Sequence, residues 1–143
     1  MRQGAGLRTH VEFRSEAFPA DPGEETKINP GRWGMGLARY LRTGLTARGF
    51  PGGELFFEDW GVCIPLNNDE FPLWVGCGNY EEFADGFLCF IEPRKTTVRK
   101  LFRKVDTSKR VEAVAHALES ALRAHPAIMS LRWWAPEEVG TQG

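Results

Sequence analysis

One stretch of the chain, residues 53–93, combines many apolar side chains with a complete absence of lysine and arginine. Its apolar runs are separated by polar turn sequences at 67–69 and 79–86, which is typical of short strands joined by turns. The same stretch contains nine acidic residues, which are Glu54, Glu58, Asp59, Asp69, Glu70, Glu81, Glu82, Asp85 and Glu92. We therefore predict that an apolar, acidic β-meander is the element around which the rest of the chain folds.

The length of 143 residues fits one domain that can bury most of its apolar side chains without cross-links. We predict a single domain over residues 1–143, with an ordered core at 9–134 and disordered ends. No apolar run approaches the ~20 residues of a membrane span, and the polar N-terminus lacks the apolar segment of a signal peptide. We therefore expect a cytoplasmic protein with no membrane association.

The cysteines and the charges limit the classes of site. Three cysteines without a C-x-x-C pair disfavour a disulfide framework or a zinc site, so we predict no metal and no cofactor. The formal net charge of −1 conceals a strong asymmetry. Residues 53–93 carry only acids, whereas residues 94–110 carry eight cations against the single acid Asp106. Blocks of one sign are usually solvated faces, but they can also steer a charged partner.

The N-terminal part of the chain predicts a strand and then a helix. Residues 9–16 alternate between apolar and polar side chains, as a half-buried strand does, and residues 18–26 contain the prolines and glycine of a loop. Asn29 suits the N-cap of a helix and Pro30 its first position. Gly49 suits the C-terminal end of the same helix.

Four strands are expected in the meander, near Leu55–Asp59, Gly61–Leu66, Leu73–Asn79 and Phe87–Glu92. The first two could instead form one strand bent at Trp60 and Gly61. The last of the four is apolar on both sides, which is typical of a strand buried on both faces.

The cationic residues that follow, 98–105, fit either one or two helical turns or a strand. Asp106 then suits the cap of a second long helix with an inward stripe from Val111 to Leu122, and residues 129–134 alternate as a last strand.

The predicted order is β-α-β-β-β-β-α-β. This order predicts the α+β class, a mostly antiparallel sheet of five to six strands with two helices packed on one face. Because two helices cover only one face, we expect a loop or a second subunit on the other.

Two features of the sequence resemble sites but have simpler structural explanations. The glycine-rich run 30–36 lies at a predicted helix start, where an anion could bind, but close packing of helix on sheet explains its glycines better. Cys77 and Cys89 are equidistant from a turn centred on Phe83, so we expect them to lie opposite each other on neighbouring strands. Core packing explains both cysteines better than metal binding, since further ligands are lacking.

Two groups of residues are candidates for binding. A small-molecule pocket between the first helix and the meander would be lined by Arg32, Trp33, Glu58, Asp59 and Trp60. A partner surface would use the cations Arg99, Lys100, Arg103 and Lys104, with Trp134 as the exposed aromatic side chain. The low sequence pI of about 6.3 disfavours a dedicated nucleic-acid binder.

No pattern of catalytic residues is present, so we predict no catalytic residue. The leading hypothesis is a non-enzymatic domain that binds a protein partner or forms a homodimer through the uncovered sheet face. One version is an inhibitor or immunity-like protein whose acidic face blocks a basic partner. The alternative is a small-molecule-binding protein or enzyme that uses the pocket between the first helix and the meander.

Overall fold

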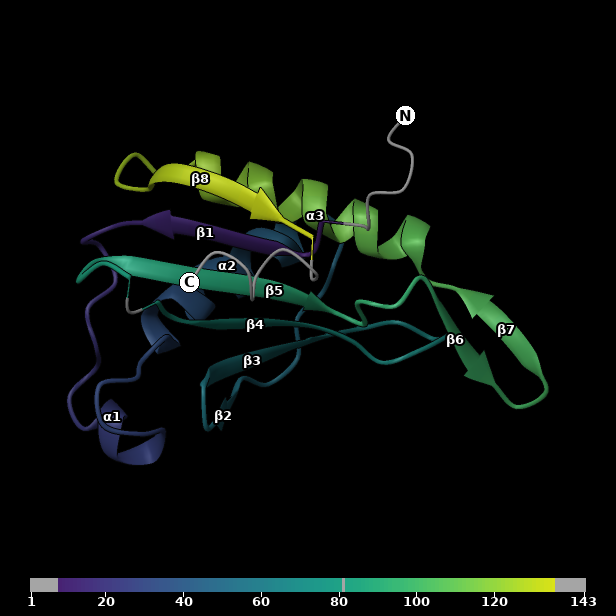
Figure 1. The fold of residues 1–143 in the computed structure, drawn as a ribbon, viewed down its shortest axis with the longest axis horizontal. Coiled ribbons are helices and arrows are strands. Elements are labelled where there is room, and N and C mark those ends of the chain that lie inside the picture. Colours follow the sequence, from purple (N-terminus) through teal and green to yellow (C-terminus); the bar gives the residue numbers. More distant parts are fainter. Residues whose placement is uncertain (1–7, 81, 136–143) are drawn as a thin grey trace.

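The structure is a computed structural model that describes residues 8–80 and 82–135. Six strands form one antiparallel sheet in the order β2-β3-β4-β5-β1-β8 (Figure 1). These strands are β1 (His10–Arg14), β2 (Phe56–Glu58), β3 (Gly61–Leu66), β4 (Leu73–Asn79), β5 (Gly86–Glu92) and β8 (Met129–Trp134). A separate hairpin consists of β6 (Thr97–Lys100) and β7 (Arg103–Asp106). The helices are α1 (Glu24–Lys27), α2 (Met35–Ala47) and α3 (Ser108–Arg123).

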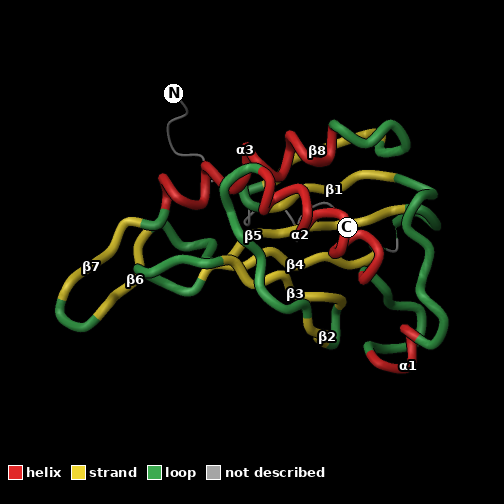
Figure 2. Tube along the Cα trace, turned by 180° about the vertical axis from the view of Figure 1, so that it is seen from behind, coloured by secondary structure: helices red, strands yellow, loops and turns green. Residues whose placement is uncertain are grey.

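Both long helices pack on the same face of the sheet, with α2 against β3 and β4 and α3 against β5. They lie behind the sheet in Figure 1 and in front of it in Figure 2, which is seen from the opposite side. This arrangement confirms the predicted α+β class and the antiparallel sheet with two helices on one face. We call the helix-covered side the inner face and the opposite side the outer face.

The hydrophobic core fills the space between the helices and the inner face. Strand residues two apart point to the same side, so Phe87, Cys89 and Ile91 of β5 all face inward and are buried. The helices contribute leucines and valines at helical spacing, including Leu41 of α2 and Leu118 of α3. The core therefore follows directly from the two periodicities of the sequence.

The predicted helix start at Asn29 and Pro30 is wrong, because α2 begins only at Met35. Residues 29–34 instead run alongside the end of β4. There the backbone N–H of Trp33 donates to Oδ1 of Asn79, and the N–H of Asn79 donates to the Trp33 carbonyl. These contacts with the sheet outweigh the local helix signal.

Glycine is required at position 34 for the same reason. A Cβ at this position would lie 2.6 Å from the carbonyl oxygen of Cys77. The backbone before α2 therefore approaches β4 more closely than any other residue would allow. The close helix–sheet packing expected of the glycine-rich run is found here.

Four further expectations are decided by the structure. Residues 55–66 do not form one bent strand, because β2 and β3 pair as an antiparallel hairpin in which Phe56 lies opposite Cys63. The short helix α1 begins inside the predicted loop 18–26 and ends one residue beyond it. Residues 98–105 form strands β6 and β7, not helical turns. The N-cap of α3 is Thr107, not Asp106, although Asp106 Oδ1 still accepts the N–H of Ser108 at 2.9 Å.

The predicted disorder at the two ends lies almost wholly outside the described residues, and Ala135, where we expected the chain to fray, is buried. Within the described ranges, no helix is long and apolar enough to cross a membrane.

Candidate binding face on the outer side of the sheet

One row of paired residues crosses the outer face through all six strands of the sheet. The register sets them side by side in the order Phe56, Cys63, Gly76, Phe90, His10 and Trp134. Because side chains alternate along each strand, these residues point away from the inward-facing core residues of the same strands. The outer face is thus rich in aromatic side chains.

Trp60, Trp74 and Phe90 form an aromatic cluster on this face. The two indole rings stack with centroids 5.9 Å apart and planes 18° apart. The Phe90 ring packs edge-on against both, with centroids 5.0 Å from Trp60 and 5.6 Å from Trp74. Offset and edge-to-face contacts of this kind are favourable beyond the area that they bury.

Gly76 provides the room for this cluster. A Cβ at position 76 would lie 2.4 Å from Cζ of Phe90 and 2.9 Å from Cη2 of Trp60. The two rings therefore lie directly on the backbone of β4, and the glycine fixes their position.

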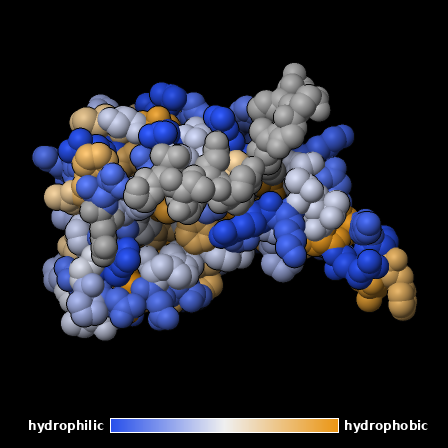
Figure 3. Space-filling model, in the orientation of Figure 1, coloured by the Kyte–Doolittle hydropathy of each residue, from blue (hydrophilic) through white to orange (hydrophobic). Residues whose placement is uncertain are grey.

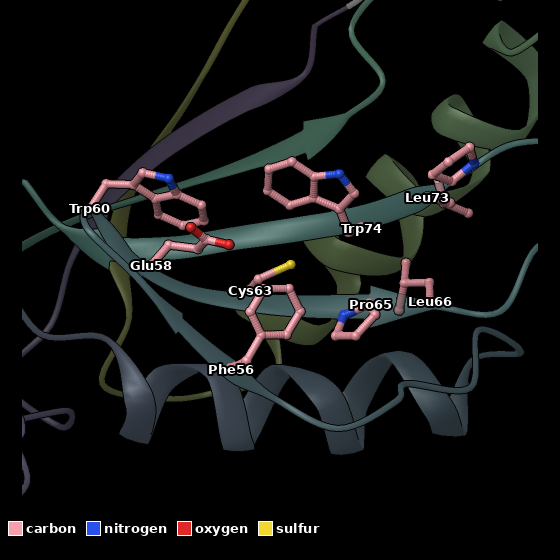
Figure 4. A pocket seen from close by; sticks show the side chains of 9 residues that line it. Phe56, Glu58, Trp60, Cys63, Pro65, Leu66, Leu73 and Trp74 are labelled. Atoms are coloured by element: carbon pink, nitrogen blue, oxygen red, sulfur yellow. The ribbon is translucent and has the colours of Figure 1, made fainter. Parts of the chain in front are cut away.

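A depression of about 540 Å³ lies beside the cluster, at the β2–β3–β4 side of the sheet (Figure 4). Its lining residues are Phe56, Glu58, Trp60, Cys63, Pro65, Leu66, Pro72, Leu73 and Trp74. Phe56 is 45% exposed although it is a large apolar residue. This volume is within the range of ~300–1,000 Å³ that is typical of ligand pockets.

Glu58 is the charged residue of the depression. It is exposed, and the described residues offer it no hydrogen bond or ion pair. Figure 4 shows its carboxylate close to the Trp60 ring, on the same side of the strands as Cys63. An aromatic wall with a carboxylate is chemically suited to a cationic or amphipathic group, through cation–π contacts and charge attraction.

The thiol of Cys63 faces the same depression but is not a nucleophile at neutral pH. Burial, and next the negative charge of Glu58, raises the pKa of Cys63 to about 12. A thiolate is the reactive form of cysteine, so the arrangement of Glu58 and Cys63 opposes thiol catalysis.

His10 and Arg94 extend the face toward β1. The His10 ring stacks on Phe90 with centroids 5.6 Å apart, and its Nδ1 lies 3.0 Å from the Thr9 hydroxyl. Burial, followed by the charge of Arg94, lowers the pKa of His10 from 6.5 to about 4. At neutral pH this imidazole is therefore an uncharged part of the aromatic surface.

The structure divides the five predicted pocket residues between two faces. Trp33 lies on the inner side, where its ring meets Phe87 edge-on at 6.4 Å and its Nε1 donates to the Phe18 carbonyl. Glu58 and Trp60 line the depression on the outer face. Among the described residues, Trp33 therefore does not share a pocket with Glu58 and Trp60.

The other two members of that set contribute backbone or edge contacts. The carbonyl of Asp59 accepts the Asn29 side-chain amide at 2.8 Å. Arg32 Nη1 lies 3.4 Å from the Asn79 carbonyl. Both residues hold the segment before α2 against the meander.

Trp134 was predicted to be the exposed aromatic residue, and this prediction is wrong. Its side chain is only 6% exposed, and its Nε1 donates to Oε1 of Glu12 at 3.0 Å. The guanidinium of Arg132 lies 4.1 Å above its ring. Trp134 does point away from Trp133, whose Nε1 donates to Glu119 of α3. Trp134 is buried because Arg132 lies over its ring and Glu12 of the neighbouring strand β1 binds its indole N–H.

The four predicted partner-binding cations lie on the β6–β7 hairpin. Lys100 Nζ donates to the Asp69 carbonyl at 3.0 Å, and Arg103 pairs with Glu70 at 2.9 Å. These contacts hold the loop end of the hairpin against the turn between β3 and β4. Arg99 and Lys104 are paired across the hairpin and exposed, and the described part of the chain gives neither an ion pair.

Cys77 and Cys89 lie opposite each other on β4 and β5, as the turn arithmetic predicted. Both are free thiols in the core, and the Cys89 thiol donates to Sγ of Cys77 at 3.7 Å. Burial, together with the Cys89 contact, raises the pKa of Cys77 well above its usual value. The pair therefore contributes to core packing in its reduced form.

Sequence reasoning did not identify the cluster of Trp60, Trp74 and Phe90, nor the place of Phe56 and His10 on the same face. The alternation in β3 to β5 could have assigned their common face, but only the strand order brings β1 beside β5. In addition, no three His, Cys, Asp or Glu side chains in the described parts of the chain are grouped so that they could hold a metal ion.

No family model matches the chain, and neither do the curated proteins or the solved structures with which it was compared. The functional argument therefore rests on the geometry of the outer face.

Proposed function

We propose that this protein is a non-enzymatic binding domain that associates with a second copy of itself through the outer face of β2 to β5. The observation that carries the proposal is the exposed Phe56 beside the cluster of Trp60, Trp74 and Phe90, on a face that neither long helix covers. Contiguous apolar surface of this kind marks interaction sites in soluble proteins, and aromatic residues are enriched in interfaces.

The charge distribution favours a second copy as the partner. The meander is acidic and the adjoining residues 94–110 are basic, so the chain carries both complementary charges. When two copies associate, the acidic residues of one can face the basic residues of the other, so one kind of molecule supplies both charges.

A basic partner, as an inhibitor or immunity-like protein would have, is the less favoured version. Several meander acids are already neutralised within the chain, through the ion pairs Glu70–Arg103, Asp85–Arg14 and Glu92–Arg94. A cytoplasmic setting remains a prediction.

Trp74→Arg tests the proposal. Trp74 is half-buried on the outer face and lies directly opposite Glu92 on β5, so an arginine at this position faces an acidic cross-strand neighbour. We expect gel filtration with light scattering to give a dimer for the wild type and a monomer for Trp74→Arg.

Met129→Gln is the matched control, because Met129 is also exposed but lies on β8 at the far edge of the sheet. It should remain dimeric. A wild type that stays monomeric at submillimolar concentration contradicts the proposal.

The second candidate is binding of a small organic cation in the depression. The unpaired carboxylate of Glu58 between aromatic side chains favours it. Tetramethylammonium should then quench tryptophan fluorescence saturably in the wild type and not in Glu58→Gln. Equal responses of the two proteins would remove this candidate.

A further inference from the structure

The β6–β7 hairpin ends in two of the most exposed apolar side chains of the described residues. Leu101 is 83% exposed and Phe102 is 98% exposed. The hairpin projects from one end of the body in Figures 1 and 2. Figure 3 shows that its hydrophobic tip is flanked by hydrophilic residues. We call residues 97–106 the arm.

The tip is a poor choice of sequence for an ordinary hairpin turn. Its two-residue loop places Leu101 at a φ of 55°, in the left-handed region. Leucine is disfavoured in this region by its Cβ, whereas glycine and asparagine adopt it readily. Leu101 thus adopts an unfavourable backbone conformation, and both side chains expose apolar surface to water. Breaches of local rules of this kind are expected at functional sites.

Contacts at its centre and next to its tip fix the position of the arm on its own molecule. Val98 and Val105 are paired at its centre, and Val105 is buried. Next to the tip, Lys100 and Arg103 bind the Asp69–Glu70 turn. A rigid arm loses little conformational freedom on docking, which favours binding.

We propose that the Leu101–Phe102 tip docks in the depression lined by Phe56, Trp60 and Trp74 of a second copy. Arg99 and Lys104, which flank the tip, then lie beside the exposed Glu58. The inference rests on the proposed self-association and specifies its contacts.

Three observations favour a second copy over another partner. The depression of about 540 Å³ has room for a leucine and a phenylalanine side chain. The unpaired cations of the arm match the unpaired acid of the depression. Because each molecule has one arm and one depression, a two-fold exchange closes the assembly and buries both tips.

The double variant Leu101→Asn with Phe102→Gly is the primary test. Asparagine adopts the left-handed conformation at position 101 more readily than leucine, so thermal unfolding should show a fold as stable as the wild type or more stable. We expect its self-association to weaken about 100-fold or more, because two large apolar side chains per molecule no longer become buried. Sedimentation velocity measures this loss.

Mixing two non-associating variants tests the pairing of tip with depression. The Asn-Gly variant keeps its depression, whereas Trp74→Arg keeps its tip. A mixture of the two retains one of the two tip–depression contacts, so we expect a heterodimer that neither variant forms alone, weaker than the wild-type dimer. A simple face-to-face contact of two sheets predicts no such rescue.

Three results would overturn the inference. Association of the Asn-Gly variant at wild-type affinity would exclude a role of the arm in dimerisation, but would not contradict self-association through the outer face. A monomeric wild type would contradict both the docking of the arm and the self-association through the outer face. Binding of monomeric wild type to vesicles of anionic phospholipid, lost in the Asn-Gly variant, would assign the tip to a lipid surface instead.

Discussion

The carboxylate of Glu24 accepts the backbone N–H of Met35 at 2.7 Å and that of Gly34 at 2.8 Å, so a residue of α1 caps the N-terminus of α2. The N-cap residue Gly34 has no side chain to do this, and the first turn of α2 contains no acid. Negative charge is favourable at a helix N-terminus. The protein therefore supplies its own anion where the glycine-rich sequence resembled a phosphate site.

Replacing Glu24 by alanine should destabilise the fold by about 2 kcal/mol, because the amides of Asp21, Gly34 and Met35 lose their acceptor. Glu24→Gln keeps one acceptor oxygen and should cost roughly half as much. Urea unfolding measures both effects. Glu16→Ala, at an exposed position, is the control and should change stability by less than about 0.5 kcal/mol. Equal effects at positions 16 and 24 would contradict the capping role.

The buried His10 predicts a loss of stability in acid. Its pKa is about 4 in the fold against 6.5 for the ordinary side chain. Between these values the unfolded chain binds the proton and the folded protein does not. Stability is therefore complete above about pH 6.5 and falls toward pH 4, by roughly 3 kcal/mol at the lower end.

The free energy of unfolding of His10→Gln, measured across this range, should show a shallower pH dependence than the wild type. His116→Gln, on the exposed side of α3, should keep the wild-type slope. An unchanged slope in His10→Gln would show that other groups cause the acid sensitivity.

Gly76→Ala should disrupt the aromatic cluster, because its methyl group requires the space of the Phe90 and Trp60 rings. We expect a cost of about 1–3 kcal/mol and a changed near-ultraviolet circular dichroism of the tryptophans. The matched control is Gly36→Ala in α2, where the nearest atom is 3.8 Å away. That change should be neutral or stabilising by about 0.5–1 kcal/mol.

The three cysteines should not react with a thiol reagent at pH 8 while the protein is folded. All three are buried, and the pKa of Cys63 is raised to about 12. With 5,5′-dithiobis(2-nitrobenzoic acid) as the reagent, each reacting thiol releases thionitrobenzoate. This release should be slow in buffer and rapid and complete in guanidinium chloride. Fast labelling of Cys63 alone in the folded protein would contradict its protected position beside Glu58.

The class of fold and the helix-covered core could be predicted because they follow from local periodicity. The pairing of Cys77 with Cys89 followed from the turn length alone. The start of α2 could not be predicted in this way, since a distant carboxylate and the close approach of Gly34 to Cys77 decide it. Local signals at Asn29 and Pro30 carry no information about those contacts.

The candidate site was only half predictable for a similar reason. Glu58 and Trp60 are two residues apart in the sequence, and they line one depression. Trp33 is distant in sequence, and its assignment to the same pocket required knowing which side of the sheet α2 covers. The exposure of Trp134 depended on β8 pairing with β1, a long-range contact that the sequence pattern does not specify.

Sedimentation equilibrium of the wild-type protein over a wide concentration range tests self-association most directly. The account predicts an average mass that rises with concentration from the 16.1 kDa of one chain toward twice that value. A constant mass of one chain at every concentration would contradict it.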